Sequence, residues 1–584
     1  MTKKWVNREA LISKQIKLLP DYPELIARLL RLRDINTKDR AVKFLNPNYE
    51  ADLHDPFLLS DMDKAVGRIL QAIERQEKIV IFGDYDADGI PGAVILSSFF
   101  DKIGFNNYEA YIPDRQKQSY GLSLDQIKQF ADLNFKLLIT VDCGITDEEE
   151  IALANKLGLE TIITDHHIVQ ATRPQALAII NPKKPEDKYP FKDLAGAGVA
   201  FKLVQGLIAR GSFNLPVGWE KWLLDLVAIA TVSDMMPMIG ENRTLTHFGL
   251  LVIGKNRRPG LASLLRSARL NPRYINEDDI GFMIGPRINS AGRMAQAVDA
   301  YHLLSAADEV EAETLASTLE KRNRQRKEML ADIVRQAEEL IADPNLSVLV
   351  FGHKDWSPGV LGLVAGRLAE KFGRPVFVWG RNGNDEIKGS CRGFGLVNVV
   401  ELMARAGGQD FFIDFGGHAG AGGFSLAPGR EQQLSERLNQ ATKDLSFTDD
   451  YQVEISYDFE LSLSEIGSDT LRLINRLAPF GTLNPKPIFL FSGLTIDAVR
   501  TFGGDDVHLE INFKNGDRRS MSAIGFFSCP PTLPEEAFDG EIGHNFPGVV
   551  LSPNRKVDLL ASLEKNFFGT GSYRLRIVDI RPAN

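Results

Sequence analysis

The chain has 584 residues, which is too long for one hydrophobic core and predicts about three or four domains. Its composition, 44% hydrophobic and 25% charged, is that of a folded protein, and no apolar run reaches the ~18–20 residues that cross a bilayer. Three scattered cysteines disfavour a disulfide framework or a structural zinc site, and the first residues lack the apolar core of a signal peptide. We therefore expect a cytoplasmic protein.

The net charge of −9 at first disfavours a polyanionic ligand, but recognition depends on the local field rather than on the whole chain. Between Lys255 and Arg293 there are eight basic residues and only three acids. This basic stretch is either a solvated surface or a contact region for nucleic acid.

Short apolar segments that run into acidic or histidine residues dominate the first half of the chain. Three of them, 79–82, 137–141 and 161–164, are predicted strands, and a fourth candidate strand covers 176–180. Helix-length segments separate these strands. Continuous apolar strands alternating with helices indicate a doubly wound parallel α/β domain, which we expect to continue into a basic, helical extension.

The second half changes character twice. Residues 308–342 are predicted to form one long helix, and the polar character of 320–327 suits a connector that crosses solvent between two lobes. A strand at 347–351 opens a second, smaller α/β domain, and beyond residue 450 alternating strands with turn residues predict an OB-like β-barrel. The expected domains are a helical segment at 1–44, the α/β domain with its extension at 45–305, the connector at 306–345, the second α/β domain at 346–445 and the barrel at 450–584.

Three carboxylates, Asp84, Asp86 and Asp88, follow the first predicted strand at every second position. Such crowding is unfavourable unless cations or protons neutralise it, and open α/β sheets bind ligands at this end of their strands. A Ca²⁺ loop of the EF-hand type is excluded because the twelfth position is Ile95 rather than Glu. A purely structural Asp-rich turn is the remaining alternative.

Further acidic and histidine residues end later apolar segments. Asp142 follows the second strand, Asp165, His166 and His167 follow the third, and Asp234 closes the apolar segment 226–232. Carboxylate and imidazole ligands together favour Mg²⁺ or Mn²⁺, with histidine favouring Mn²⁺, whereas zinc is disfavoured because no thiolate cluster exists. Taken alone, Asp234 is more often a helix-end or turn residue than a ligand.

These motifs, in this order and spacing, resemble the DHH phosphoesterase superfamily. The similarity continues through residues 282–293, and residues 389–392 and 416–423 are similar to the DHHA1 domain. Residues 477–481 and Asn484-Pro485 resemble the OB-type domain of the RecJ branch of this superfamily.

The resemblance implies a single-stranded-DNA-specific 5′→3′ exonuclease of DNA repair and recombination, which releases 5′-mononucleotides by hydrolysis with two Mn²⁺ or Mg²⁺ ions. The implied metal ligands are Asp84, Asp86, Asp88, Asp142, His166 and Asp234, with Asp142 bridging the ions. Asp84 and Asp165 are implied either as ligands or as partners that orient the ligands. The implied catalytic residues are His167, Asp165 and Asp142. The implied substrate-binding residues are Arg287, Asn289, Arg293, Ser390, Arg392, Gly417 and His418. Its expected partners are single-stranded DNA, a single-strand-binding protein and a helicase, and a monomer without membrane contact is expected.

The sequence departs from the family pattern at three places. Ile90-Pro91 replaces a small hydroxylated pair, Ser119 stands where glycine commonly precedes tyrosine, and Arg33-Asp34 stands where Arg-Gly is usual. None of these removes a proposed ligand, so activity is still expected.

Two other functions compete with this one. A small-substrate DHH hydrolase of pyrophosphate, cyclic dinucleotides or short oligonucleotides is disfavoured by the length of the chain and by Pro479-Phe480-Gly481. A non-catalytic scaffold of a replication complex is disfavoured because every proposed ligand is present. Phe480, Phe502 and Phe526 are either base-stacking platforms or, as we favour, barrel core.

Overall fold

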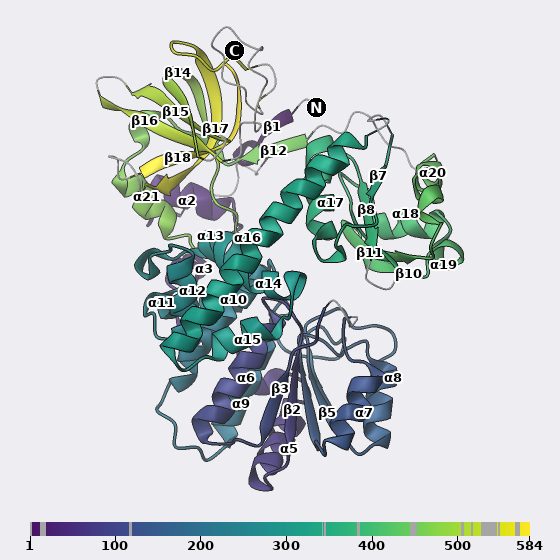
Figure 1. Ribbon diagram of the computed structural model, residues 1–584. Helices are drawn as coiled ribbons and strands as arrows, with labels where there is room; N and C mark the ends of the chain where they lie inside the picture. Colours follow the sequence, from purple (N-terminus) through teal and green to yellow (C-terminus); the bar gives the residue numbers. More distant parts are fainter. Residues whose placement is uncertain are drawn as a thin grey trace. The chain divides into compact units, whose positions relative to one another are not determined.

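The structure is a computed structural model (Figure 1). It describes residues 3–11, 19–115, 120–341, 343, 346–381, 386–443, 453–503, 507–515, 518–526, 546, 549–566 and 573–583. The chain forms two compact units: the first comprises residues 1–53, 237–247 and 452–584, and the second comprises 54–236 and 248–451. Within the described residues, none of the helices has the length and apolarity that a membrane span requires.

The second unit contains a parallel five-stranded sheet in the order β3-β2-β4-β5-β6. Its strands are β2 (Ile79–Gly83), β3 (Tyr108–Tyr111), β4 (Leu137–Val141), β5 (Glu160–Thr164) and β6 (Ala178–Ile180). Helices α6 (Gly89–Ile103) and α9 (Gly196–Arg210) pack together on one face, and α7 (Leu124–Asp132) and α8 (Glu148–Lys156) cover the other. The predicted doubly wound sheet is confirmed, and only the half-buried edge strand β3 was not predicted.

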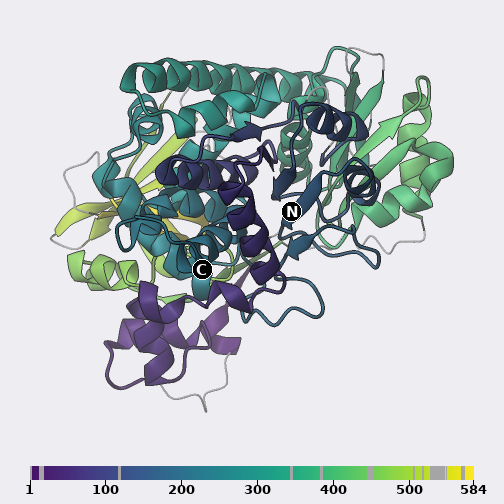
Figure 2. The ribbon, with the colours of Figure 1, turned by 90° about the horizontal axis from the view of Figure 1, so that it is seen from below.

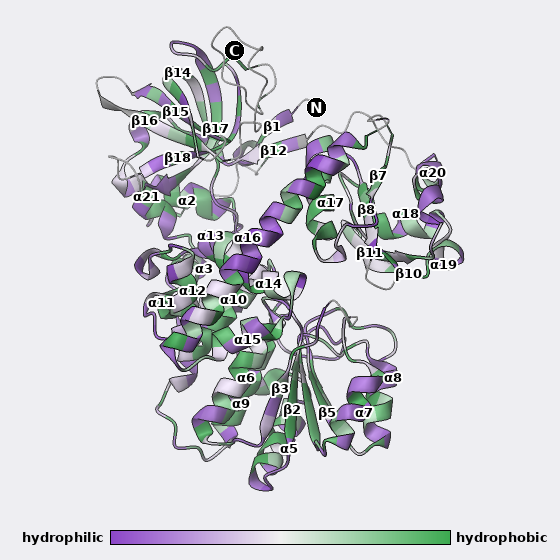
Figure 3. Cartoon of the chain, in the orientation of Figure 1, coloured by the Kyte–Doolittle hydropathy of each residue, from purple (hydrophilic) through white to green (hydrophobic). Residues whose placement is uncertain are grey.

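The strand register explains why the acidic motifs meet. Gly83 pairs with Val141 and Val141 pairs with Thr164, so the next residues along the three strands are Asp84, Asp142 and Asp165. The strands are apolar and buried (Figure 3), whereas the residues that follow them are charged. Sequence periodicity and sheet register therefore bring three carboxylates to one edge of the sheet.

Helices follow the sheet and lead into the predicted connector. They are α10 (Leu224–Ser233), α11 (Gly240–Gly254), α12 (Pro259–Ser267), the π-helical segment η4 (Ile280–Ile284), α14 (Gly285–Met294), α15 (Val298–Ser305) and α16 (Glu309–Glu339). Helix α16 is unbroken (Figure 2), which confirms the long helix expected over 308–342.

The polar middle of α16 faces solvent on one side only: Lys321 and Arg324 are exposed, whereas the other side contacts neighbouring helices. Asn323 is buried, Glu320 accepts a hydrogen bond from Arg287 Nε of α14 at 2.6 Å, and Arg322 forms an ion pair with Asp299 of α15. This part of α16 packs against neighbouring helices through ion pairs rather than through an apolar stripe. Hydropathy alone does not distinguish such a helix from a solvated one.

A mixed five-stranded sheet in the order β10-β11-β9-β8-β7 forms the expected second α/β domain. Its strands are β7 (Leu349–Gly352), β8 (Val376–Arg381), β9 (Ile387–Arg392), β10 (Asp414–His418) and β11 (Ala421–Leu426). Helix α17 (Pro358–Phe372) contributes to one apolar cluster on this sheet, and α18 (Val399–Arg405) and α20 (Glu431–Ala441) contribute to another.

The first unit contains a closed β-barrel, as expected for an OB-like fold. The order β14-β15-β16-β18-β17 closes because β14 also pairs with β17. Its strands are β14 (Phe489–Phe502), β15 (His508–Asn515), β16 (Arg518–Gly525), β17 (Lys556–Lys565) and β18 (Tyr573–Pro582). Strand β14 has a bulge between Phe491 and Leu494, where its register with β17 shifts. Phe480 is core as we favoured, but Phe502 and Phe526 are half-buried around His508.

The N-terminal residues are not an independent helical segment. Strand β1 (Lys3–Asn7) pairs in parallel with β12 (Val453–Tyr457). Helices α2 (Glu24–Arg31) and α3 (Lys38–Leu45) follow, and Ile26, Leu29 and Leu30 of α2 belong to the apolar core of the barrel. Chain segments more than 400 residues apart therefore share one core, which local sequence patterns do not reveal.

Asp34 provides a first prediction, because it stands where the family commonly has glycine. It ends the turn after α2 with φ of 56°, in the left-handed region, and its side chain is exposed. Asp34→Gly should relieve this strain and raise the stability of the first unit by up to about 1 kcal/mol. Thermal unfolding would check this, with exposed Asp39 of α3 replaced by glycine as a control that should lower the Tm.

Candidate metal centre

The Asp-rich turn after β2 is tightly folded. Asp86 Oδ1 accepts hydrogen bonds from the backbone N–H groups of Asp88 at 2.7 Å and Gly89 at 3.1 Å. A Cβ atom at Gly89 would lie 2.6 Å from the backbone of Asp84, so only glycine fits here. Asn289 Oδ1 of α14 accepts from Ala87 N at 2.9 Å. The turn is thus fixed both by its own bonds and from α14.

Asp88 is held at the N-terminus of α9. Its two carboxylate oxygens each accept a backbone N–H at 2.7 Å, one from Gly196 and one from Ala197. Burial, followed by the charge of Asp86, raises the pKa of Asp88 to about 7 despite these bonds. The carboxylate is therefore fixed in position while the negative charge around it is under-compensated.

Asp142 occupies the middle of the site. Its φ is 64°, and its backbone N–H donates to Thr164 O at 2.9 Å. Its Oδ1 lies 3.0 Å from His166 Nε2 but is buried without a well-aligned hydrogen bond. Burial, and then the charges of Asp88 and Asp86, raise the pKa of Asp142 well above its usual range. A buried acceptor among like charges is the environment that a cation relieves.

His166 faces three carboxylates. Its Nε2 lies 3.0 Å from Asp142 Oδ1, 3.6 Å from Asp234 Oδ2 and 3.7 Å from Asp88 Oδ2. Burial, and then the neighbouring His167, lower the pKa of His166 to about 4. A neutral imidazole whose Nε2 points at carboxylates has the lone pair that a metal ligand requires. Asp234 joins from the C-terminal end of α10, and burial and Asp88 raise its pKa to about 7.

Asp165 positions the histidines instead of facing the carboxylates. Its Oδ1 accepts from His166 N, His167 N and His167 Nδ1 at 2.7, 3.0 and 2.8 Å, and its Oδ2 accepts from Ile145 N at 3.1 Å. Burial alone would lower the pKa of His167, but the hydrogen bond and charge of Asp165 raise it above its ordinary value. Because Nδ1 is engaged, His167 presents Nε2 for other contacts.

These side chains fit divalent cations. Among the described residues, the sets whose ligand atoms lie within 4.8 Å of one another are Asp84, Asp86 and Asp142; Asp88, His166 and Asp234; and Asp142, His166 and His167. Buried atoms without hydrogen-bond partners occur within these sets at Asp84 Oδ1, Asp142 Oδ1 and His166 Nδ1. Carboxylate oxygens, which make up most of the ligand atoms of these sets, together with imidazole nitrogens suit Mg²⁺ and Mn²⁺.

Positive charge gathers beside the carboxylates, on residues that we call the arginine cluster: Arg115, Arg293, Arg326 and Arg392. Burial, and then the charges of the other three, lower the pKa of Arg293 to about 9, while Asp86 opposes this shift. Arg293 donates to Gly359 O at 3.1 Å, and Arg115 lies over the ring of Tyr85 at 4.9 Å. Arg293, buried among the charges of three other arginines and near Asp86, forms with them a setting for a polyanion.

The other predicted substrate-binding residues divide into two groups. On β9, β10 and β11, Arg392 pairs with Ala421 and Ala421 pairs with His418, so Ser390, Arg392, Gly417 and His418 lie on neighbouring strands. Gly417 has φ of 132°, and a Cβ there would lie 2.4 Å from Ala421 O. Asn289 instead supports the Asp-rich turn.

The contacts of Arg287 indicate a structural role beside the substrate-binding role expected of it. The residue is 5% exposed, its Nε donates to Glu320 at 2.6 Å, and its Nη1 donates to Met283 O at 2.8 Å. The Arg287 guanidinium pairs with Glu320 and thereby links α14 to α16. The spacing of the motif alone did not distinguish a residue that supports the fold from one that binds substrate.

Tyr120, Arg115 and Arg326 were missed in the sequence. Tyr120 follows Ser119, which lies outside the described residues, and its hydroxyl donates to Asp142 O at 2.9 Å and lies 3.2 Å from His167 Nδ1. Arg115 and Arg326 come from a loop and from the polar middle of α16, where isolated arginines give no signal. The departure at Ile90-Pro91 is accommodated because Pro91 lies in the first turn of α6.

Tyr120→Phe is expected to lower the turnover number about fivefold, because one partly buried hydrogen bond that steadies Asp142 and His167 contributes about 1 kcal/mol. Steady-state kinetics on single-stranded DNA would measure it. Tyr111→Phe, on edge strand β3 of the same sheet, is the matched control and should leave turnover unchanged. Equal rates for Tyr120→Phe and the unaltered protein would contradict the positioning role.

Comparison with known proteins agrees with this geometry. The model of the DHH family N-terminal domain matches residues 78–231, that of the DHHA1 domain matches 345–444, and that of the RecJ OB domain matches 457–579. The single-stranded-DNA-specific exonuclease RecJ of Bacillus subtilis is 36% identical over 518 residues, which cover 88% of this chain but only 64% of that protein, less than two thirds of its length. The protein of the same name from Salmonella typhimurium is 33% identical over 83% of this chain and 85% of its own.

A solved structure, RecJ from Thermus thermophilus in complex with Mn²⁺, superposes with a TM-score of 0.78 and 26% identity, covering all of this chain and 80% of that one. A second, in complex with Mg²⁺, gives a TM-score of 0.74. With three domain models matched in order and relatives above 30% identity over most of both chains, the protein belongs to the RecJ family of DHH-domain proteins.

Proposed function

We propose that the protein is a metal-dependent exonuclease that degrades single-stranded DNA in the 5′→3′ direction and releases 5′-mononucleotides. The observation that carries this proposal is the overlap of the candidate metal sets: Asp142 belongs to two of them, and so does His166. Overlapping sets with a shared carboxylate are the arrangement that a two-ion phosphodiesterase requires.

In this proposal the ligands are Asp84, Asp86, Asp88, Asp142, His166 and Asp234, with Asp142 bridging two Mn²⁺ or Mg²⁺ ions. Bound divalent ions would supply Lewis-acid polarisation of the phosphodiester and lower the pKa of water. The residues themselves hold the geometry: α9 fixes Asp88 and Asp165 fixes both histidines. His167, with Nε2 presented, is proposed to contact the scissile phosphate.

Substrate binding is proposed for the arginine cluster together with Asn289, Ser390, Gly417 and His418. Guanidinium groups bind phosphate oxygens bidentately, and the glycines of β10 and β11 let backbone groups approach an anion. Asn289 would act indirectly, through the Asp-rich turn. A strand whose phosphates reach these groups one after another would be cleaved from its end.

The barrel is proposed to hold the trailing strand by phosphate contacts and base stacking. Phe502, His508 and Phe526 form a half-buried aromatic group with ring centroids 5.1–6.3 Å apart, and Arg576 lies over Phe526 at 4.1 Å. Aromatic and guanidinium surfaces on OB-type barrels suit sequence-independent stacking. The domain division at residues 45, 306, 346 and 450 is part of this proposal, with residues 1–44 assigned to the barrel core.

The cellular process, the compartment and the partner proteins are proposed from the substrate. A DNA exonuclease of this kind would serve DNA repair and recombination in the cytoplasm as a monomer, alongside a helicase that unwinds duplex and a single-strand-binding protein that coats the product. Co-purification and sedimentation would test these partners and the monomeric state.

The test of the proposed function is hydrolysis of 5′- and 3′-end-labelled DNA and RNA, single- and double-stranded, with Mn²⁺, Mg²⁺ or a chelator. We expect mononucleotides from single-stranded DNA with either ion and none with the chelator. Cleavage restricted to dinucleotides would refute the proposal in favour of a small-substrate hydrolase. Loss of label from the 3′ end first would refute the direction.

Arg392→Ala should weaken binding of single-stranded DNA and make it less sensitive to salt. Arg392 belongs to the arginine cluster, and losing one phosphate contact lowers the slope of log K against log salt by about 0.7 for a single strand. Fluorescence anisotropy with a chelator present would measure this slope. Arg367→Ala on α17 of the same domain is a control that should leave the slope unchanged, and an unchanged slope for Arg392→Ala would refute the contact.

A further inference from the structure

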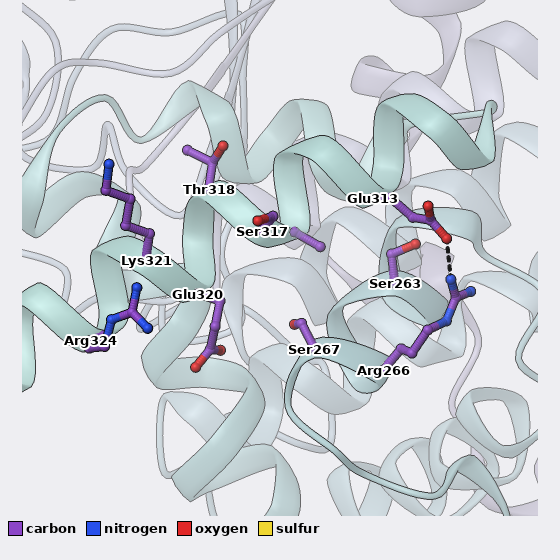
Figure 4. Close-up of a pocket in the computed structure, with 10 residues that line it drawn as sticks. Ser263, Arg266, Ser267, Glu313, Ser317, Thr318, Glu320, Lys321 and Arg324 are labelled. Carbon is purple, nitrogen blue, oxygen red and sulfur yellow. Dashed lines mark hydrogen bonds and ion pairs between the residues drawn. The ribbon is translucent and has the colours of Figure 1, made fainter.

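A pocket of about 500 Å³ lies between α12 and α16 in the second unit, apart from the candidate metal centre (Figure 4). Two features of the sequence meet in it: α12 belongs to the basic stretch from Lys255 to Arg293, and the pocket side of α16 includes part of its polar middle. The lining residues are Ser263, Arg266, Ser267, Glu313, Ala316, Ser317, Thr318, Glu320, Lys321 and Arg324.

The two acids of this pocket are already neutralised. Arg266 forms an ion pair with Glu313 across the pocket, which Figure 4 marks with a dashed line. Arg287 of α14 donates to Glu320 at 2.6 Å. Lys321 and Arg324 are exposed and make no ion pair with any described residue, so the pocket carries two uncompensated positive charges.

Hydroxyl groups complete the lining. Ser263 is only 4% exposed, and within the described part of the chain neither its hydroxyl nor that of Ser317 makes a hydrogen bond. Ser267 and Thr318 are different, because their hydroxyls donate to Leu264 O and Thr314 O. Only one of these free hydroxyls lies near the free charges. Ser317 precedes Lys321 by one helical turn, whereas Ser263 lies at the other end of the pocket, beside Glu313 (Figure 4). A hydroxyl donor, an ammonium and a guanidinium on one face of α16 match the several acceptor oxygens of a phosphate group.

The pocket is separate from the proposed catalytic site. Arg326 of the arginine cluster follows Arg324 by two residues, which is about 200° around the helix, so the two arginines leave α16 on different faces. A ligand in the pocket would therefore not occupy the candidate metal centre.

We propose that this pocket is a second phosphate site, which binds a nucleotide phosphate through Lys321, Arg324 and Ser317. The phosphate is either a phosphodiester of the nucleic acid strand or the monoester of a free mononucleotide. The first source rests on the proposed function, because it requires single-stranded DNA as the substrate. The second does not.

The test compares the unaltered protein with two double variants in the presence of a chelator, so that no strand is cleaved. Lys321→Gln/Arg324→Gln removes both free charges of the pocket. Lys136→Gln/Lys156→Gln removes two exposed lysines at the amino-terminal end of the parallel strands and keeps the same net charge. Each protein is titrated with a fluorescent oligothymidylate, with thymidine 5′-monophosphate and with inorganic phosphate, and circular dichroism checks that each is folded.

We expect the pocket variant, but not the control variant, to bind one of these probes about fivefold more weakly. A loss confined to the oligothymidylate, with a salt slope lower by about 1.4, assigns the site to the strand. A loss with thymidine monophosphate or inorganic phosphate assigns it to a free ligand. Equal binding by the two variants for all three probes would overturn the proposal.

A second measurement reports on the pocket directly. In the unaltered protein, the bound probe should protect Lys321 from acetylation while Lys136 and Lys156 stay reactive, as read by mass spectrometry. Equal reactivity of Lys321 with and without every probe would also overturn the proposal. A protein that hydrolyses no DNA but protects Lys321 when thymidine monophosphate binds would refute the proposed function and leave this site intact.

Discussion

Asp142→Ala is expected to lower the turnover number on single-stranded DNA by at least about a thousandfold, because the shared ligand of two candidate metal sets is lost. The fold should persist, since the backbone of Asp142 pairs with Thr164 independently of the side chain. With a chelator present, the variant should melt at a higher temperature than the unaltered protein. A buried carboxyl whose pKa is raised in the folded state destabilises that state at neutral pH.

Thermal melts with Mn²⁺ distinguish the loss of metal binding from the gain in stability expected for Asp142→Ala. Mn²⁺ should raise the Tm of the unaltered protein but not that of Asp142→Ala, because a ligand stabilises only the state that binds it. Asp147→Asn is the matched control: this buried carboxyl five residues away accepts a hydrogen bond from Leu122 N but belongs to none of the candidate metal sets. Near-normal turnover by Asp142→Ala, or its stabilisation by Mn²⁺, would refute the bridging role.

The carboxylates of the candidate site could be predicted because their positions depend on local rules. An apolar strand followed by an acid predicts a side chain at the carboxyl edge of a parallel sheet, and three such strands in register bring Asp84, Asp142 and Asp165 to one edge. The sequence pattern did not distinguish the carboxylates that would bind metal from those that position other side chains. Asp165 directs all its bonds at the histidines and Ile145, which only coordinates reveal.

The positively charged half of the site was harder to predict. Arg115, Arg326 and Tyr120 come from loops and from one face of a long helix, and no periodicity marks a residue that acts through tertiary proximity. Arg287 shows the converse case, since it lies in an informative motif and its guanidinium already pairs with Glu320. Charge counted along the sequence does not record which charges are already paired.

The domain boundaries show the same limit for the fold. The barrel was predictable from its turns and alternation, but the placement of α2 in the barrel core depends on contacts across more than 400 residues. Deleting everything after residue 450 would therefore expose Ile26, Leu29 and Leu30, and a loss of activity in such a truncation would not isolate the grip of the barrel on DNA. Substitutions of Phe526 and Arg576 test that grip without breaking the shared core.

Asp165→Asn is expected to be nearly as damaging to turnover as the loss of a ligand, but for a different reason. The carboxylate accepts four N–H groups, and an amide in its place must turn its NH₂ group towards at least one of these donors. His167 would lose its fixed orientation, and turnover should fall about 10²–10⁴-fold with little change in KM.

The stability effect should have the opposite sign to that of Asp142→Ala. Burial alone would raise the pKa of Asp165, but the hydrogen bond and charge of His167 bring it below its ordinary value. A carboxyl with a lowered pKa stabilises the fold above its unfolded pKa and loses that contribution as pH falls through the folded value, so at neutral pH the full contribution is present. Asp165→Asn should therefore lower the free energy of unfolding by about 1–3 kcal/mol. Thermal melts of both variants in chelator would show opposite shifts in Tm, and shifts in the same direction would contradict the division between a metal-binding Asp142 and a positioning Asp165.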